Sequence, residues 1–586
     1  MNMRGTKIVC TIGPASDSEE MLIQLVTAGM NVARLNFSHG NHEEHKNRID
    51  TIKRVRQKLQ RPVAIMLDTK GPEVRLGSFK AGTAEINAGD RFVLTIEDVL
   101  GDNTRCSITY KELPKEVSEG TKILIADGLI ELRVVDKTET EVVCQVINGG
   151  TLADRKNVNI PGATSKLPAI TQKDISDLVF GIENDIDMVA ASFIRKATDV
   201  LEIRKILEEN GGSFISIISK IENQEGVDNV DEILKVSDGL MVARGDLGVE
   251  LPAEEIPLTQ KMLIRKCNKS GKPVITATQM LDSMMRNPRP TRAEVTDIAN
   301  SILDGTDAIM LSGETAAGKY PIDAVKTMAI IAERTERDLD YRLIEKRQEY
   351  KDGITVANAI SHASCTTAYE LGAAAIITPT QSGSTARMVS KFRPKAPIIA
   401  ATFDERVRRK LCLSFGVHSV LIQGVDSTDD LIEQSVNQAI ANEYISSGDL
   451  VVITAGVPAG VAGTTNLIKV HIVGNIAARG IGVGQHSITG KVAIIRDLEK
   501  DSEKVEDGDI LVVVSTDKEV VPLMKKASAF IIEEGGITSH AAIVGLALGK
   551  PVIVGVKNAM ELFKDGQIVT MDTIRGVIYK GTARVL

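Results

Sequence analysis

Short apolar runs recur along the first 345 residues, and each run ends in polar residues before an amphipathic helical pattern begins. Runs of this length predict strands, and apolar residues spaced three and four apart predict helices. Strands alternating with helices favour a parallel sheet, and eight repeats favour a closed (β/α)8 barrel, with its chemistry at the carboxyl ends of the strands. The predicted strands are 7–14, 31–40, 63–71, 187–194, 214–223, 239–248, 273–280 and 308–315.

One interval, 73–168, interrupts this rhythm, because it lacks long helical periodicity and carries short strand patterns between turn signals. We interpret it as an inserted β-barrel domain above the barrel mouth, where it would serve as a lid. The catalytic barrel itself is then built from residues 1–72 and 169–345.

Two further units follow in the second half of the chain. Residues 355–473 alternate strand and helix patterns, which predicts an α/β sandwich. The stretch 474–490 is rich in glycine and is typical of a linker, and residues 475–586 form an extra C-terminal unit. The sequence therefore predicts an α/β protein with a barrel, a lid, a sandwich domain and a tail.

Composition narrows the possible partners. The net charge of -8 among 586 residues leaves no basic excess for general nucleic-acid binding. No apolar run is long enough to span a bilayer, so we expect no membrane association. The six cysteines are scattered without a CxxC pair, which is typical of a reducing compartment and of neither a zinc site nor a disulfide framework. The chain also runs almost at once into a strand, so we expect a cytoplasmic location.

Charged residues interrupt the apolar run "IISKIENQEG" at 217–226. Lys220 and Glu222 are two apart in a predicted strand, so their side chains point the same way. Similar polar residues lie at or just beyond the carboxyl ends of the other predicted strands. They are Arg34, Asn36, Ser38, Asp68, Thr69, Lys70, Arg75, Ser192, Arg244, Asp246, Thr278, Ser312 and Glu314. A structural ion pair or cap explains any one of them, but the whole set falls at the catalytic end of the predicted barrel.

This set is suited to phosphoryl transfer. Glu222 and Asp246 offer two carboxylates, which suit Mg²⁺. Lys220, Arg34 and Arg75 offer positive charge for a phosphoryl group in transfer. Neither a Walker loop nor a protein-kinase glycine loop is present, which argues against those two classes. The turn in "VARGDLGVE" would present backbone N–H groups to a substrate carboxylate.

The same stretches resemble the pyruvate kinase family, block after block, from residue 1 to about 473. The matching blocks are "NVARLNFSHG", "LDTKGPEVR", "SKIENQEG", "MVARGDLGVE", "ITATQMLDSM", "RPTRAEVTDIAN" and "MLSGETAAG". The tail is similar to the arrangement in bacillus-type members. The resemblance implies phosphoryl transfer from phosphoenolpyruvate to ADP, giving pyruvate and ATP, with Mg²⁺ (or Mn²⁺) and K⁺ as cofactors and a homotetrameric assembly.

The resemblance also implies roles for individual residues. Lys220 would stabilise the phosphoryl group, and Glu222 and Asp246 would hold Mg²⁺. Thr278 and the backbone of Ala243, Arg244, Gly245 and Asp246 would hold the substrate carboxylate and place the enolate for protonation, with Ser312 in the proton relay. The K⁺ site would comprise Asn36, Ser38, Asp68 and Thr69, and Glu73 matches K⁺-dependent members. The nucleotide side would comprise Pro14, Arg34, Asn36, His39, Arg75 and Lys156, although a structural histidine and a solvated lysine remain alternatives for His39 and Lys156.

The run "TPTQSGSTAR" at 378–387 places hydroxyl and N–H groups at a predicted helix start, a common anion site. The candidate effector residues are Thr380, Ser382, Gly383, Ser384 and Thr385; an ordinary helix cap is the alternative. Family members that bind fructose bisphosphate carry a lysine where this chain has Gln381. We therefore expect a monophosphate activator, AMP or ribose 5-phosphate.

The tail segment 533–555, "EEGGITSHAAIVGLALGKPVIVG", resembles the phosphohistidine domain of pyruvate phosphate dikinase and phosphoenolpyruvate synthase. His540 falls on that family's phosphorylated histidine. The chain contains no recognisable ATP-grasp-like region to serve a carrier, so we interpret His540 as a vestige in a domain that serves stability or assembly. A working phosphoryl carrier is the alternative.

Two other functions compete with a kinase. A carbon–carbon lyase acting through pyruvate enolate would use the metal carboxylates, but it has little need for Lys220, Arg34 and Arg75 together. A catalytically dead sensor would have lost Lys220 or a carboxylate, and none is lost here.

Overall fold

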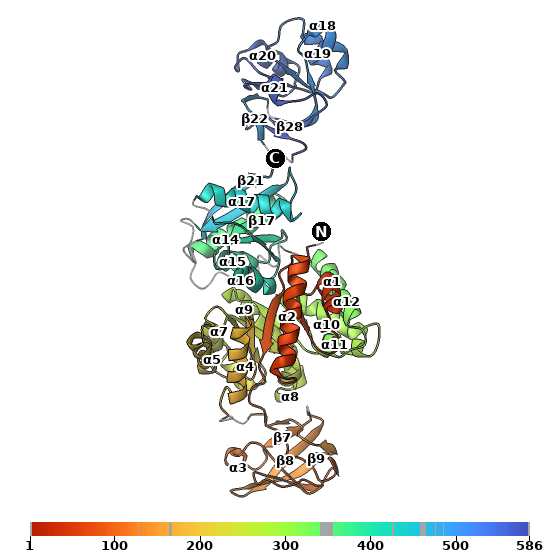
Figure 1. The fold of residues 1–586 in the computed structure, drawn as a ribbon, viewed down its shortest axis with the longest axis vertical. Coiled ribbons are helices and arrows are strands. Elements are labelled where there is room, and N and C mark those ends of the chain that lie inside the picture. The colour runs from red at the N-terminus through yellow and green to blue at the C-terminus, as the bar shows by residue number, and fades with distance from the viewer. Residues whose placement is uncertain are drawn as a thin grey trace.

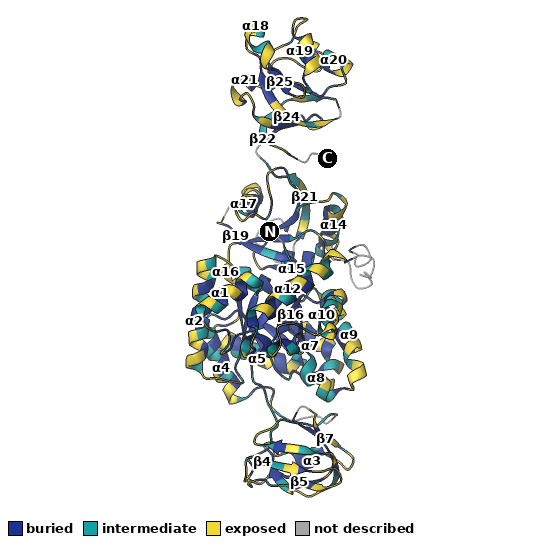
Figure 2. Ribbon diagram, turned by 90° about the vertical axis from the view of Figure 1, so that its right-hand side faces the viewer, coloured by how far each residue is buried: buried dark blue, intermediate teal, exposed yellow. Residues whose placement is uncertain are grey.

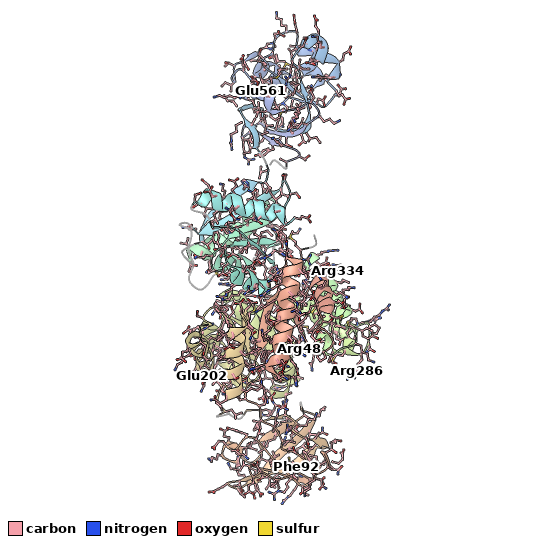
Figure 3. The ribbon with its side chains drawn as sticks, viewed as in Figure 1. Arg48, Phe92, Glu202, Arg286, Arg334 and Glu561 are labelled. Carbon is pink, nitrogen blue, oxygen red and sulfur yellow. The ribbon has the colours of Figure 1, made fainter. Side chains whose placement is uncertain are left out.

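The computed structural model describes residues 3–126, 128–162, 167–339, 341, 355–424, 427–456, 465–474, 476–484 and 486–583. The domains follow one another along an elongated molecule, with the lid at one end and the tail at the other (Figure 1). Phe92 in the lid and Glu561 in the tail mark these opposite ends in Figure 3. The expected domain boundaries at 345 and 475 lie outside the described residues.

Eight parallel strands close into the predicted barrel, in the order β1-β16-β15-β14-β13-β12-β3-β2. They are β1 (Lys7–Thr11), β2 (Val32–Asn36), β3 (Ala64–Asp68), β12 (Met188–Ala191), β13 (Ser216–Ile221), β14 (Gly239–Ala243), β15 (Val274–Ala277) and β16 (Ala308–Leu311). All eight predicted strands are confirmed, but each ends earlier than predicted. The polar residues that follow belong to loops and short helices, such as α8 (Arg244–Glu250), which begins directly after β14.

Helices surround this barrel with their exposed faces outward and the buried strands inside (Figure 2). Their ends follow ordinary capping rules: Ser18 caps the first helix, and a Thr171–Asp174 capping box starts α4. The helices are α1 (Glu19–Ala28), α2 (His42–Leu59), α4 (Gln172–Glu183), α5 (Ala197–Glu209), α6 (Gln224–Asp228), α7 (Val230–Val236), α9 (Ile256–Ser270), α10 (Arg292–Asp304), α11 (Gly313–Ala316) and α12 (Pro321–Arg337).

The inserted lid is almost entirely β structure, as its short strand patterns predict. One sheet has the order β11-β7-β8-β9-β5-β6, and β10 pairs with β4 in a second. The elements are β4 (Thr83–Ile86), β5 (Arg91–Thr95), β6 (Arg105–Ser107), α3 (Leu113–Glu116), β7 (Lys122–Ile125), β8 (Ile130–Lys137), β9 (Glu141–Asn148), β10 (Gly150–Ala153) and β11 (Val158–Asn159). An isolated bridge between Arg75 and Asn157 joins the two ends of the insert beside the barrel.

The sandwich domain has five strands in the order β19-β18-β17-β20-β21, with β21 antiparallel to β20. Helices lie beside this sheet and complete the predicted α/β arrangement (Figure 1). The elements are α14 (Val356–Glu370), β17 (Ala375–Pro379), α15 (Ser384–Ser390), β18 (Ile398–Thr402), α16 (Glu405–Lys410), β19 (Val417–Leu421), α17 (Thr428–Ala441), β20 (Leu450–Gly456) and β21 (Thr465–Ile472).

The tail is a separate α/β domain around one eight-stranded sheet, with the order β22-β29-β28-β24-β25-β26-β27-β23. Its strands are β22 (Ile476–Arg479), β23 (Ile481–Val483), β24 (Ser487–Ile494), β25 (Ile510–Val513), β26 (Ala529–Ile532), β27 (Val552–Val554), β28 (Ile568–Asp572) and β29 (Val577–Lys580). Its helices are α18 (Leu498–Asp501), α19 (Val521–Lys526), α20 (His540–Ala547) and α21 (Ala559–Leu562).

The prediction that 474–490 is a linker is wrong, because this stretch supplies β22, β23 and the start of β24. Its glycines allow close packing instead of flexibility. A Cβ on Gly482 would lie 1.7 Å from the Thr573 carbonyl oxygen, and one on Gly480 would lie 2.6 Å from that of Val554. Among the described residues, no helix is both long enough and apolar enough to cross a bilayer.

Candidate active site

A cavity of about 390 Å³ opens between the carboxyl ends of the barrel strands and the lid. The barrel contributes charged and polar side chains. The lid contributes residues from its two ends, next to Arg75 and Asn157. The lining residues are Arg34, Asn36, Ser38, His39, Asp68, Lys70, Glu73, Arg75, Ala126, Arg155, Lys156, Asn157, Ser192, Phe193, Lys220, Glu222 and Asp246. Most of the residues that the sequence placed at the strand ends therefore meet in one cavity.

Lys220 projects from the end of β13 into a ring of oxygen atoms. Its Nζ lies 2.9 Å from Glu222 Oε1, 3.2 Å from Asp68 Oδ1 and 2.8 Å from Ser192 Oγ. Burial lowers the pKa of Lys220, but the Asp68 and Glu222 carboxylates outweigh burial and raise the pKa above its usual value. The ammonium group therefore stays charged at neutral pH and faces the cavity.

Arg34, on β2, is fixed against the neighbouring strands. Its Nε donates to Asp68 Oδ2 at 2.6 Å, and one terminal nitrogen donates to Thr11 Oγ1 at 2.8 Å. Burial raises the pKa of Asp68, but Arg34 and Lys220 outweigh it and hold the pKa below its usual value. Asp68 is thus an anion between two cations, and it holds both in place.

Two carboxylates face the same cavity and fit a divalent cation. Glu222 is 1% exposed, and its Oε2 accepts from the Phe193 N–H at 2.6 Å. Burial raises the pKa of Glu222; Lys220 lowers it and nearby Asp246 raises it. Among the described residues, the Asp246 side chain has no hydrogen-bond or ion-pair partner. This pair suits Mg²⁺, which takes one or two carboxylates and completes its shell with substrate oxygens and water.

Thr278 lies directly after β15 and beside the start of α8. The Gly245 N–H donates to Thr278 Oγ1 at 2.8 Å, and Thr278 Oγ1 donates to the Ala277 carbonyl at 2.7 Å. Thr278 and the predicted backbone donors from Ala243 to Gly245 do not line the cavity. Asp246, the next residue in the chain, does line it. Ser312 is also outside the lining; its N–H donates to Glu314 Oε2 at 2.7 Å at the start of α11.

The potassium and nucleotide candidates are mostly clustered at the lid side of the cavity. Glu73 Oε2 accepts from Arg75 at 2.7 and 2.8 Å and lies 3.6 Å from Lys70 Nζ. Asn36 and Ser38 line the cavity, and Thr69 lies just behind it, with its Oγ1 accepting from the Ser192 N–H.

Of the other nucleotide-side candidates, His39 and Lys156 line the cavity. His39 is exposed, and its carbonyl accepts from His45 Nε2 at 2.9 Å. Pro14 is exposed in the turn after β1 and is not part of the lining. The cavity is therefore lined at this side without a contribution from Pro14.

Sequence reasoning missed Ala126, Arg155, Asn157 and Phe193 as lining residues. Arg155 and Asn157 reach the cavity because the bridge between Arg75 and Asn157 brings together residues 82 positions apart, and Arg75 donates to the Arg155 carbonyl at 3.0 Å. The only local signal was their position beside Lys156. Phe193 adopts a left-handed backbone conformation, φ +55°, which no pattern in the apolar run predicted.

The remaining candidates lie in other domains. Gly383 (φ +79°) precedes α15, whose first turn has no side-chain cap. Thr380 and Thr385 are buried, with Thr385 Oγ1 3.1 Å from Thr465 Oγ1, whereas Ser382 is exposed. His540 is exposed at the start of α20, with its Nδ1 3.0 Å from Thr516 Oγ1.

Comparison with known proteins agrees with this arrangement. Residues 3–325 match the family described as "Pyruvate kinase, barrel domain", and residues 358–471 match "Pyruvate kinase, alpha/beta domain". Residues 505–576 match "PEP-utilising enzyme, mobile domain".

Similar full-length proteins carry the same family name. The chain is 56% identical over 585 residues to the pyruvate kinase of Geobacillus stearothermophilus and 54% identical over 586 residues to that of Bacillus licheniformis, each match covering 100% of both chains. The crystal structure of a pyruvate kinase from Cryptosporidium parvum superposes with a TM-score of 0.77 at 42% identity, covering 80% of this chain and 96% of that one. The chain therefore belongs to the pyruvate kinase family of phosphotransferases.

Proposed function

We propose that the protein transfers the phosphoryl group of phosphoenolpyruvate to ADP, giving pyruvate and ATP. The observation that carries this proposal is the position of the Lys220 ammonium group, which faces a cavity shared with Glu222, Asp246 and the Arg34–Asp68 pair. A fixed positive charge beside two carboxylates is the arrangement that phosphoryl transfer requires.

Residues in the cavity and beside it have separate roles in this reaction. The Lys220 and Arg34 cations stabilise the charge that spreads over the phosphoryl oxygens, and their ion pairs to Asp68 hold them in position before substrate arrives. Thr278, with the backbone N–H groups at the start of α8, orients the substrate carboxylate and the enolate for protonation, and Ser312 belongs to the proton relay. Arg75 and Lys156, at the lid connection, hold the nucleotide phosphates.

Two cations would complete the site. Glu222 and Asp246 would hold Mg²⁺ (or Mn²⁺), which supplies positive charge to the phosphoryl and enolate oxygens. K⁺ would be held by oxygens of Asn36, Ser38, Asp68 and Thr69, beside Glu73. The donor set supports both, because carboxylate, amide and hydroxyl oxygens suit hard cations.

The test is a coupled assay of pyruvate formation from phosphoenolpyruvate and ADP, with and without Mg²⁺ and K⁺. We expect turnover only with both cations present. A protein that cleaves or forms a carbon–carbon bond of pyruvate but makes no ATP would instead support the lyase alternative.

We also propose that the sandwich domain binds an activator that carries one phosphate group. The proposed binding residues are Thr380, Ser382, Gly383, Ser384 and Thr385. The proposal is supported by the uncapped first turn of α15 and by Arg387, which donates to the Ser382 carbonyl at 3.3 Å beside the same loop. Gln381 offers no charge for a second phosphate.

Titration of AMP, ribose 5-phosphate and fructose 1,6-bisphosphate into the assay tests this binding site. We expect activation by a monophosphate at the lowest concentration and its loss in Ser384→Asp, whose carboxylate would repel phosphate. Activation by fructose 1,6-bisphosphate at a lower concentration would contradict the proposal. We further expect a homotetramer in cytoplasm, which light scattering and fractionation would test.

A further inference from the structure

The backbone immediately after β15 is strained. Thr278 and Gln279 adopt left-handed conformations, with φ +67° and +55°. For a β-branched residue such as Thr278 this conformation is unfavourable, and it persists only where the surrounding structure fixes it. The turn carries the Thr278 hydroxyl group, which lies at the start of α8. The contacts that fix the turn therefore also fix this hydroxyl, which has a role in the proposed reaction.

The Arg244 side chain supplies those contacts. Its Nε donates to the Ala277 carbonyl at 3.3 Å, and a terminal nitrogen donates to the Thr278 carbonyl at 2.7 Å. The next residue, Gly245, donates its N–H to Thr278 Oγ1. The Arg244 guanidinium therefore donates to two successive carbonyl groups, and the Gly245 N–H fixes the Thr278 hydroxyl.

Arg244 is itself anchored from a third element. Its other terminal nitrogen lies 2.7 Å from both carboxylate oxygens of Asp297 on α10. The Arg244 side chain is 10% exposed and that of Asp297 is 36% exposed, and neither residue lines the cavity. The contacts that link this ion pair to the reaction site are therefore the Arg244 hydrogen bonds to the turn at Thr278.

We propose that Asp297 and the Arg244 guanidinium are positioning residues that act through Thr278. The proposal rests on the function proposed above, in which Thr278 orients the enolate for protonation. The ion pair keeps the peptide between Thr278 and Gln279 in its left-handed arrangement and so keeps the hydroxyl against the Gly245 N–H. Without Asp297 that guanidinium nitrogen keeps only a long bond to Gln260 Oε1, 3.5 Å, so the turn relaxes and the hydroxyl leaves its position.

The experiment compares Asp297→Ala, Asp297→Asn, Thr278→Ala and the double variant Asp297→Ala/Thr278→Ala in the full-length protein. Asp297→Asn keeps an oxygen acceptor for Arg244 and should recover part of the loss. Glu141→Ala is the matched control, because the Glu141 carboxylate is 31% exposed, close to Asp297, and pairs with Arg105 at 2.8 Å in the lid. Two rates are measured: overall turnover, and the exchange of pyruvate methyl protons for solvent deuterium with Mg²⁺, K⁺ and ATP present.

We expect Asp297→Ala to slow proton exchange and turnover roughly 10- to 100-fold. The KM for ADP should change less than about twofold. The melting temperature should equal that of the Glu141→Ala control. The double variant should be no slower than Thr278→Ala, because Asp297 acts only through Thr278. Independent, multiplying losses in the double variant would overturn the proposal, and so would wild-type rates in Asp297→Ala. A wild-type protein that makes no pyruvate would instead contradict the proposed function itself.

Discussion

At the scale of single residues, Lys220 is held by three oxygen partners before any substrate binds. Its charge is most valuable in the transition state, where negative charge moves between oxygens. We predict that Lys220→Met lowers kcat by a factor that corresponds to about 3 kcal/mol or more, while phosphoenolpyruvate still binds. The coupled assay gives kcat, and calorimetry gives binding.

Lys205→Met is a suitable control, because the Lys205 side chain is 73% exposed on α5 and, in the part of the chain that the structure describes, pairs only with Glu209. The control should retain wild-type kinetics. Near-normal turnover in Lys220→Met would show that Lys220 has no part in phosphoryl transfer.

Glu73 is the second informative residue, because its carboxylate lies in the same cavity as the proposed potassium ligands. We predict that activity requires K⁺ and that Glu73→Lys reduces the requirement, since the new ammonium group would supply the missing positive charge. Glu73→Gln removes the negative charge without adding a positive one, so it should remain K⁺-dependent. The measurement is turnover against K⁺ concentration in a buffer with a large organic cation, and equal wild-type rates without K⁺ would rule out the site.

At the scale of elements, the barrel strands and their polar ends could be predicted from the sequence. Each strand is a short apolar run that stops at polar residues, so Lys220, Glu222 and Asp68 could be placed in one cavity. The lid contribution of Arg155 and Asn157 could not be predicted, because it depends on a pairing across 82 positions. The left-handed turn at Thr278 was equally hidden, since tertiary contacts and not local propensity impose it.

The glycine-rich stretch 474–490 is the clearest failure of local reasoning, because flexible linkers and tightly packed strands share this composition. We predict that Gly482→Ala destabilises the tail by roughly 1–3 kcal/mol or more, since its Cβ would collide with the Thr573 carbonyl. Gly536→Ala is the matched control in the same domain, with nothing within 4 Å of the added Cβ. Limited proteolysis of the tail is the measurement; equal protection in both variants would contradict the packing argument.

The contact between β1 and β19 also gives a prediction about pH. Lys7 is buried, its Nζ donates to the Val417 carbonyl at 2.6 Å, and burial lowers its pKa from 10.5 to about 8. Between these two values the unfolded chain binds more protons than the folded one, so folding stability rises with pH. Relative to Lys7→Met, wild type should gain up to about 1.4 kcal/mol per pH unit across this window.

Thermal unfolding of both proteins from pH 7 to pH 10 tests this expectation, because groups common to the two proteins cancel in the difference. A difference that stays constant over this range would mean that Lys7 keeps its ordinary pKa in the folded protein.

At the scale of the whole molecule, the tail lies at the opposite end from the lid (Figure 1), and the cavity lies between the lid connection and the barrel. The tail contacts the sandwich domain at a narrow neck. There, a Cβ on Gly448 would lie 2.2 Å from the Thr582 carbonyl oxygen. Ile472 packs against a small cluster formed by Val577, Tyr579 and Ala583. We predict that His540→Ala leaves turnover unchanged, because no described contact links His540 to the barrel within one chain. Deleting 475–586 should spare chemistry and lower the melting temperature, since it uncovers this neck.

Steady-state kinetics and thermal unfolding of both variants provide the measurements. Incubation with labelled phosphoenolpyruvate examines the alternative: an acid-labile, base-stable label on His540 at useful stoichiometry would make the tail a phosphoryl carrier.

The closure of the barrel between β1 and β16 has a consequence during synthesis. This seam pairs Lys7 with Ala308, about 300 residues later, and ribosomes add roughly 5–20 residues per second. The exposed edge of β1 must therefore wait roughly 15–60 seconds for its partner, whereas β8 and β9 of the lid pair as neighbours almost at once. Because an unpaired edge attracts other chains, a nascent chain of this protein should depend on chaperones until residue 311 emerges, and the tail is made only afterwards.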